Sequence, residues 1–360
     1  MWIKVCNFVA RKKNMEKVID EGGLGRFRAL IAAAQRIVIC GHVNPDGDAV
    51  GSALALQHWL LRQGKECTVV LPNTFPDFLL WMPGAKDIKA YRRHEAEVAP
   101  IIEQADLFVI ADLNSPSRLM DIETLVMANP APKVMIDHHM SPADFCDVTI
   151  SHPEMCATAE VLCHLFWQLG ELQQLAEAEA VCLYAGMMCD TGAFTYASTR
   201  AVIYECVSHL LARGIDKDRI YRNVYYTASL ARLRLQGYML YVNLRMRKNL
   251  HAAVMTLTNA ERRRFGVKNG DTEGLVNMPL QISGTRLSIF LTEDTELEGL
   301  VKVSLRSVDD FPCNKMAEEF FGGGGHLNAS GGKLYCAMDE ALKVVDRALQ
   351  KYAPLLKGQV

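Results

Sequence analysis

The first half of the chain alternates short apolar runs with longer segments in which apolar residues recur at helical spacing. The apolar runs, rich in β-branched residues, lie at Arg36–Cys40, Cys67–Leu71, Leu107–Ile110 and Lys133–Ile136. Helical spacing is clearest in Ala49–Gln63, and further helical segments run from Thr158 to about Leu211. Strands that alternate with helices form βαβ units. The pattern therefore predicts an α/β domain with a mostly parallel sheet flanked by helices.

The second half begins with a basic segment, 219–264, which contains ten basic residues and a single acidic residue, Glu261. Five tyrosines are interleaved with these charges. One interpretation is a solvated linker helix followed by an edge strand. The other is a positive wall beside a phosphate-bearing ligand, with aromatic rings available for stacking. The sequence leaves both open.

A strand is predicted at His251–Leu257, near the end of that segment. Further strands are predicted at Arg286–Leu291 and Val301–Leu305, and helices at Cys313–Phe321 and Met338–Lys351. They predict a smaller α+β domain. A chain of 360 residues exceeds what one core usually serves. We therefore predict a first domain over 15–218, a basic helical linker over 219–245 and a second domain over 246–360. Whether residues 1–14 belong to the native protein stays open, because Met15 opens a more ordinary amphipathic segment.

The composition limits the class of protein. Hydrophobic residues make up 50% of the chain and charged residues 22%, as in globular proteins. The formal charge of −2 argues against binding of long duplex nucleic acid by bulk electrostatics. No apolar run approaches the roughly 20 residues of a membrane span. The eleven cysteines form no C-x-x-C pair, which favours reduced thiols in a cytoplasmic protein over a disulfide scaffold or a thiolate zinc site.

The segment 42–48 carries the first candidate chemistry. His42, Asp46 and Asp48 directly follow an apolar run and precede a helical segment. Burying such groups at a strand end is costly unless a cation pairs with them. Open α/β sheets also bind their ligands at the carboxyl ends of strands. Asp48 alone could be a helix N-cap, but the three residues together favour a ligand site.

The same arrangement recurs further along the chain. Asp112 follows the run at 107–110, the triplet Asp137-His138-His139 follows the run at 133–136, and Asp190 follows an apolar run that begins at Val181. Oxygen and imidazole ligands without a thiolate favour Mn²⁺ or Mg²⁺ over structural zinc. Six or seven ligands suit two ions about 3.5–4 Å apart, an arrangement that clamps a phosphoryl group. Phosphoester hydrolysis is the predicted reaction class.

A second group of candidate residues lies near the C-terminus. Four consecutive glycines, 322–325, follow a helical segment and precede His326. One glycine would be an ordinary C-cap, whereas four permit a tight loop whose N–H groups approach an anion. Upstream, Lys302, Ser304 and Arg306 alternate with apolar residues, so they share one face of a strand. Arginine there could bind phosphate through two hydrogen bonds.

These motifs resemble those of the DHH phosphoesterases, a family named for the triplet that Asp137-His138-His139 matches. The segment 42–48 resembles the first motif of the family, Asp112 the second and Asp190-Thr191-Gly192 the fourth. Gly322–His326 resembles the hallmark loop of the DHH-associated C-terminal domain. The resemblance covers nearly the whole chain. It is closer to stand-alone nanoRNA phosphodiesterases that also act on 3′-phosphoadenosine 5′-phosphate (pAp) than to the longer single-strand exonucleases or to family II pyrophosphatases.

The resemblance implies a role for each matching position. One metal would be held by His42, Asp46 and Asp112, and the second by Asp48, His138 and Asp190, with Asp112 bridging both. Asp137 would support the fold or the surroundings of His138. His139 would face the reacting phosphate as a catalytic residue, together with Asp112. Substrate contacts would come from Arg118, Ser304, Arg306, Gly323, Gly324, Gly325 and His326.

The implied activity is a two-metal hydrolase in which a metal-held hydroxide attacks phosphorus in a cleft between the domains. Substrates would be short oligoribonucleotides or dinucleotides, cut to nucleoside 5′-monophosphates, with pAp as a related substrate. Mn²⁺ is the expected ion, with Mg²⁺ or Co²⁺ as alternatives. A cyclic di-AMP phosphodiesterase is the alternative within the same chemistry. A non-catalytic nucleotide- or RNA-binding module is disfavoured by the intact ligand set. A homodimer fits a chain of this size, but the sequence locates no interface.

Overall fold

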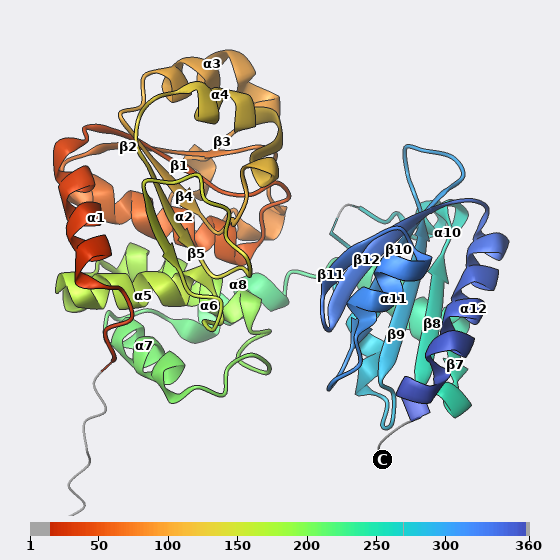
Figure 1. Cartoon of the computed structure of the whole chain (residues 1–360). Coiled ribbons are helices and arrows are strands. Elements are labelled where there is room, and N and C mark those ends of the chain that lie inside the picture. Colours follow the sequence, from red (N-terminus) through yellow and green to blue (C-terminus); the bar gives the residue numbers. More distant parts are fainter. Residues whose placement is uncertain (1–14, 269, 358–360) are drawn as a thin grey trace, which may run out of the picture. The chain divides into compact units, whose positions relative to one another are not determined.

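A computed structural model of the chain describes residues 15–268 and 270–357 (Figure 1). Residues 1–14, whose place in the native protein the sequence left open, lie outside the described residues. The chain divides into two compact units between Thr227 and Ala228. This boundary falls inside the predicted linker, 219–245. Ile220 packs in the core of the first unit and Leu235 in a core of the second, so the linker residues belong to the two units rather than to a separate element.

The first unit contains a six-stranded sheet in the order β3-β2-β1-β4-β5-β6, and every neighbouring pair is parallel. The fold class predicted for this domain is therefore confirmed. The strands are β1 (Arg36–Cys40), β2 (Glu66–Leu71), β3 (Lys89–Ala90), β4 (Leu107–Ala111), β5 (Lys133–Asp137) and β6 (Val148–Ser151). The helices are α1 (Glu21–Ala33), α2 (Gly47–Arg62), α3 (Tyr91–Glu103), α4 (Glu123–Ala128), α5 (Thr158–Leu169), α6 (Glu177–Asp190), α7 (Ala201–Leu211) and α8 (Lys217–Tyr225).

Both faces of this sheet are buried, which explains why its strands read as continuous apolar runs. Ile37 and Ile39 of β1 point into the core formed with α1, α2, α5 and α6. Val38 and Cys40 point into the opposite core, formed with α3 and α4 (Figure 1). The sequence did not predict β3 and β6, because these edge strands are short and lack such a run.

The second unit has a mixed sheet in the order β11-β12-β10-β9-β8-β7. Only β8 and β9 are parallel, and the other neighbouring pairs are antiparallel. The strands are β7 (Arg245–Arg247), β8 (Ala252–Leu257), β9 (Leu287–Glu293), β10 (Leu300–Ser307), β11 (Gly324–His326) and β12 (Ala329–Tyr335). The helices are α9 (Leu230–Tyr238), α10 (Asn259–Phe265), α11 (Cys313–Phe320) and α12 (Met338–Lys357). This confirms the predicted smaller α+β domain.

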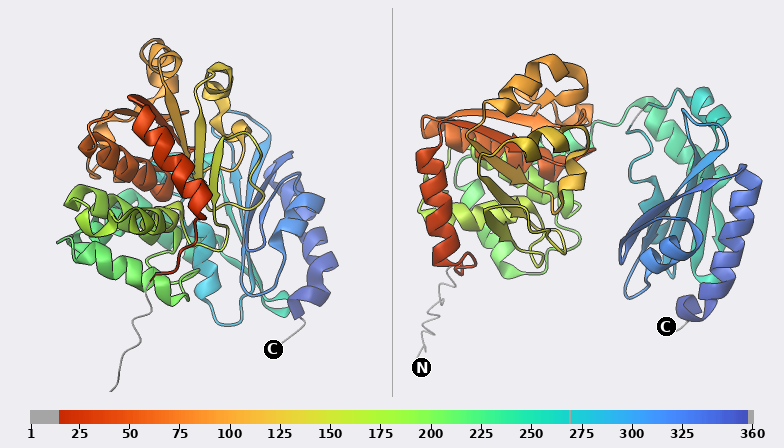
Figure 2. Two further views of the ribbon diagram at one scale, coloured as in Figure 1. Left: turned by 60° about the vertical axis from the view of Figure 1, so that its left-hand side comes forward. Right: turned by 45° about the horizontal axis from the view of Figure 1, so that its top comes forward.

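The two faces of the second sheet have separate cores. Val301, Val303 and Leu305 of β10 pack with α11 and α12, and α12 runs along that face as the dark blue helix in Figure 2. On the other face, Phe290 of β9 packs with Leu235 of α9. Because residues alternate along β10, Lys302, Ser304 and Arg306 lie on this second face.

The sequence predicts that the chain has no membrane span and that its cysteines are reduced. Among the described residues, no helix combines the length and the apolar character needed to cross a bilayer. The ten cysteines in the described part of the chain are free thiols.

Candidate active site

Three strands of the first unit place candidate side chains at one edge of the sheet. His42 follows β1, Asp112 follows β4 and His138 follows β5, and these strands are parallel neighbours. Their carboxyl ends therefore meet at the same edge. Asp112 has a φ of 60°, a left-handed conformation that is rare outside glycine and concentrates at functional sites. The topology thus brings together residues that are far apart in the sequence.

Two helices add further carboxylates to this edge because they pack unusually closely. A Cβ atom on Gly51 of α2 would lie 2.5 Å from the Cys182 carbonyl oxygen of α6. A Cβ atom on Gly186 of α6 would lie 2.7 Å from Asp48 Oδ1. The missing side chains let the two backbones approach, so Asp48 in the first turn of α2 lies near Asp190 at the end of α6.

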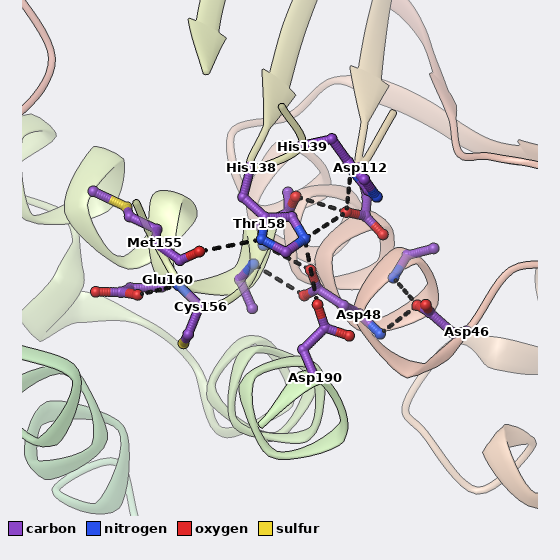
Figure 3. Close-up of polar contacts among 12 residues, drawn as sticks. Asp46, Asp48, Asp112, His138, His139, Met155, Cys156, Thr158, Glu160 and Asp190 are labelled. Atoms are coloured by element: carbon purple, nitrogen blue, oxygen red, sulfur yellow. Dashed lines mark hydrogen bonds and ion pairs between the residues drawn. The ribbon is translucent and has the colours of Figure 1, made fainter. Parts of the chain in front are cut away.

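The donor atoms fall into two groups that share Asp112. In the first group, His42 Nε2 lies 3.4 Å from Asp112 Oδ2 and 3.9 Å from Asp46 Oδ2. In the second group, His138 Nε2 lies 3.3 Å from Asp190 Oδ2 and 3.6 Å from Asp112 Oδ1 (Figure 3). Within each set of three, His42–Asp46–Asp112 and Asp48–His138–Asp190, the donor atoms all lie within 4.8 Å of one another. These are the sets that the resemblance implied.

Hydrogen bonds orient both histidines for metal binding. Nδ1 of His42 lies 2.7 Å from the Val43 carbonyl oxygen, and Nδ1 of His138 lies 3.2 Å from the Met155 carbonyl oxygen. A carbonyl can only accept, so Nδ1 carries the proton and Nε2 is left with its lone pair toward the carboxylates. Histidines that bind metals usually donate their other N–H in this way.

The electrostatics of the cluster favour a cation. Burial and the nearby charge of Asp112 raise the pKa of Asp48 to about 7. Burial and the charges of Asp48, Asp46 and Asp112 raise the pKa of Asp190. For Asp112, burial acts in the same direction, but the hydrogen bond and charge of His42 outweigh it and hold the pKa at about 2. A divalent cation would relieve the repulsion among these carboxylates.

The type of ligand also fits a divalent ion. The candidate groups found among the described residues, which also include Asp112, His138 and His139 together, contain carboxylate oxygens and imidazole nitrogens only. Cys189 lies beside Asp190, but burial raises the pKa of its thiol, so it stays protonated. Carboxylate and imidazole donors suit Mn²⁺ or Mg²⁺. The residues present therefore fit the metal site that the sequence predicts.

Asp46 and Asp137, which neighbour the candidate ligands Asp48 and His138 in the sequence, make hydrogen bonds that support the local structure. Asp46, not Asp48, is the N-cap of α2, because its Oδ1 accepts hydrogen bonds from the N–H groups of Asp48 and Ala49. The alternative that Asp48 is the cap is therefore wrong. Asp137 orients His139 rather than His138: it accepts hydrogen bonds from the His139 backbone N–H (3.1 Å) and Nδ1 (2.8 Å). His139 Nδ1 lies 3.7 Å from Asp112 Oδ1, so this ring borders the cluster.

Arg118 lies close to the first group of donors. Its carbonyl oxygen accepts a hydrogen bond from the Val43 N–H at 2.9 Å, next to His42. Its charge acts on the imidazole of His42, where it opposes the rise in pKa caused by Asp112 and Asp46. The structure thus places this predicted substrate contact next to the candidate metal ligands.

The sequence analysis assigned no role to Thr158, whose hydroxyl donates to Asp112 Oδ1 at 2.9 Å and whose backbone N–H donates to Asp48 Oδ2 at 2.6 Å. Thr158 is fully buried at the first position of α5. A hydroxylated residue at a helix start is common, so only the fold could reveal that it contacts two candidate ligands.

In the second unit, the strand face predicted to carry Lys302, Ser304 and Arg306 lines a pocket of about 390 Å³. Arg262, from the basic segment 219–264, lines the same pocket. Arg245 and Arg247 of that segment instead lie on β7, an edge strand, as the first interpretation of the segment, a linker helix followed by an edge strand, expects. His326 and Gly323–Gly325 are not among the lining residues.

The glycine-rich segment forms a helix end and a strand rather than an open loop. The Gly323 N–H donates to the Ala317 carbonyl of α11, and β11 (Gly324–His326) pairs with β12. A Cβ atom on Gly323 would lie 1.9 Å from the Gly331 carbonyl oxygen, and one on Gly325 would lie 2.6 Å from the Ala329 oxygen. These glycines are thus required by close backbone packing, which the prediction of an anion-binding loop did not include.

Comparison with known protein families identifies the two domains of the chain. Residues 36–187 match the DHH family, N-terminal domain, and residues 248–351 match the DHHA1 domain. The chain therefore belongs to the DHH family of phosphoesterases and carries a DHHA1 domain after the DHH domain. This confirms the family that the motifs resemble.

The chain is also similar to individual proteins over most of its length. The chain is similar to a solved structure of an exopolyphosphatase-related protein from Bacteroides fragilis, with 49% identity, a TM-score of 0.92 and coverage of 95% of this chain and 100% of that chain. It is 28% identical to the bifunctional oligoribonuclease and PAP phosphatase NrnA of Thermus thermophilus, over 88% of this chain and 89% of the relative. It is 25% identical to the cyclic-di-AMP phosphodiesterase GdpP of Geobacillus thermodenitrificans, over 90% of this chain and 49% of the relative.

Proposed function

We propose that this protein hydrolyses short oligoribonucleotides and dinucleotides such as pApA to nucleoside 5′-monophosphates, and pAp to AMP. The observation that carries the proposal is that the two donor groups meet at Asp112, which belongs to the first group and lies 3.6 Å from His138 Nε2 of the second, because two adjacent divalent ions suit phosphoryl chemistry. The NrnA relative, which matches over 88% of this chain, supports the substrate class.

His42, Asp46 and Asp112 would hold one ion, and Asp48, His138 and Asp190 the other, with Asp112 shared. Mn²⁺ is the expected ion, and Mg²⁺ or Co²⁺ are the alternatives. When bound, the ions would supply Lewis acidity to the phosphoryl group and lower the pKa of a water molecule.

The remaining residues act on the substrate directly. His139 keeps a proton on Nδ1 toward Asp137, which fixes its ring beside Asp112. With a second proton on Nε2, it would stabilise charge on the phosphoryl group or give that proton to the leaving oxygen, while Nδ1 keeps its own proton toward Asp137. Arg118 would add positive charge near His42. From the second unit, the terminal phosphate or sugar would be bound by Ser304, Arg306, Gly323, Gly324, Gly325 and His326.

A substrate panel tests this function. Purified full-length protein with Mn²⁺ is incubated with pApA, pAp and cyclic di-AMP in competition, and the products are identified by mass. We expect AMP from pApA and from pAp. The variants Asp46→Ala and Asp112→Ala, shown to be folded by circular dichroism, should lose this activity. If they release AMP as fast as the parent protein, the proposed site is wrong.

The same panel decides between two further functions. The GdpP relative favours cyclic di-AMP as the alternative substrate, and preferential opening of the cyclic dinucleotide would support it. RNA affinity without turnover of any substrate under Mn²⁺ would support a binding module.

The ten free thiols in the described chain fit a reducing compartment, so we propose that the protein acts in the cytoplasm.

A further inference from the structure

A short segment, Met155–Glu160, contacts three of the candidate metal ligands. The Met155 carbonyl oxygen accepts from His138 Nδ1 at 3.2 Å. The backbone N–H groups of Thr158 and Ala159 donate to the two oxygens of Asp48 at 2.6 and 3.0 Å, and the Thr158 hydroxyl donates to Asp112 (Figure 3). The orientation of these ligands therefore depends on where this segment lies.

Glu160 and Arg200 fix the position of this segment through contacts that do not involve the candidate metal ligands. The fully buried Glu160 carboxylate accepts a hydrogen bond from the Cys156 N–H at 2.8 Å. Arg200 Nη1 lies 3.1 Å from Glu160 Oε1 and donates to the Glu154 carbonyl at 2.9 Å. Arg200 precedes α7, so it ties the start of the segment and its only buried carboxylate to a different part of the unit.

We infer that Glu160 and Arg200 are positioning residues for the second metal, the one assigned above to Asp48, His138 and Asp190; this rests on the proposed metal site. Neither residue belongs to a candidate donor group among the described residues. They act by keeping the Met155 carbonyl and the Thr158 N–H in register with His138 and Asp48. Loss of such supporting contacts typically weakens metal binding 10- to 100-fold.

The chain contains a matched control for a purely structural role. Glu179, in the first turn of α6, is 1% exposed, accepts from the Ala176 N–H at 2.7 Å and pairs with Arg62 Nε at 3.0 Å. It is therefore also a buried helix-capping glutamate with an arginine partner. It precedes Asp190 by eleven residues of the same helix, roughly 16 Å along the axis. Its loss should destabilise the fold without reaching the metal ligands.

The experiment compares Glu160→Gln, Arg200→Gln and Glu179→Gln in the full-length, metal-free protein. Mn²⁺ binding is measured by titration with electron paramagnetic resonance of the free ion, and stability by urea unfolding without metal. We expect Glu160→Gln and Glu179→Gln to be destabilised to a similar extent. Glu160→Gln should bind one of its two Mn²⁺ ions at least about tenfold less tightly, Arg200→Gln should bind that ion a few-fold less tightly, and Glu179→Gln should bind both like the parent.

Several outcomes would overturn this inference. One is a folded Glu160→Gln protein whose two Mn²⁺ affinities stay within twofold of the parent, and another is an equal loss of affinity in Glu179→Gln. If Glu160→Gln does not fold, the partly exposed Arg200 decides, and unchanged binding in Arg200→Gln counts against the inference. A parent protein that binds no Mn²⁺ would refute both this role and the proposed function. A parent that binds two ions but cleaves no nucleotide would refute only the proposed function.

Discussion

The two units carry their candidate functional groups in opposite physical settings. In the first unit, Asp48 and Asp112 are almost completely buried, at 0% and 1% exposure, among other carboxylates. In the second unit, Ser304 and Arg306 are half-buried beside an open pocket, and His326 is exposed at an edge strand. The first arrangement is unfavourable without a cation, whereas the second is stable in water with or without an anion.

This difference decides how much each unit says about function. Buried like charges persist in a fold only when something compensates them, so their presence alone indicates a ligand. Partly exposed basic side chains are solvated by water and counter-ions at little cost. Their presence alone therefore does not indicate a ligand, and an experiment with substrate is needed to show one. Four experiments test this difference between the two units.

The largest expected effect is on catalysis by the first unit. Asp112→Asn removes the carboxylate shared by both donor groups, so we expect kcat/KM for pApA with Mn²⁺ to fall by about 1,000-fold or more. Asp121→Asn, at a carboxylate that pairs with Arg92 on the surface of the same unit, serves as the control and should retain activity. Comparable activity in Asp112→Asn and its control would refute the shared site.

The next effect concerns the stability of the second unit alone. Gly323→Ala places a Cβ atom against the Gly331 carbonyl, so we expect the free energy of unfolding of this unit to fall by about 3 kcal/mol. Gly237→Ala in α9, where a Cβ atom meets nothing within 4 Å, should leave it unchanged or slightly raised. Urea unfolding monitors both. Unaltered Mn²⁺ affinity in Gly323→Ala would show that the two units are energetically separate.

Metal addition should stabilise one unit and not the other. At a concentration of Mn²⁺ 100 times its Kd, binding adds about 2.7 kcal/mol to the unfolding free energy of the unit that holds it. Hydrogen exchange, resolved by peptide, should therefore slow in the sheet β1, β4 and β5 and stay the same in β9 and β10. Equal protection of both sheets would contradict the assignment of the metals to the first unit.

The smallest effect is on substrate affinity through the second unit. Arg306→Ala should raise the KM for pApA about tenfold and leave kcat nearly unchanged, since a charge-assisted hydrogen bond to phosphate would be lost away from the reacting bond. Arg247→Ala, which removes an exposed pair with Asp346, is the control in the same unit. A fall in kcat with constant KM would instead place Arg306 at the reacting phosphorus.

Much of the first unit could be predicted because its strands are buried on both faces. The run Arg36–Cys40 coincides with β1, and the polar residues after β1, β4 and β5 fall where parallel strands end. The edge strands β3 and β6, and the strands β11 and β12 of the second unit, carry no comparable run. Glycine-rich β11 and β12 read as a loop because their pairing depends on backbone contacts between residues without side chains.

The set of candidate ligands follows from the amino-acid sequence alone, because histidines and aspartates that directly follow apolar runs have few other reasons to be there. The arrangement of these ligands in space follows only from the fold. The glycine-mediated contact of α2 with α6 sets Asp48 beside Asp190, and the start of α5 turns its N–H groups toward Asp48. Such contacts join residues more than a hundred positions apart, and distance along a chain carries no record of which backbone groups meet in space.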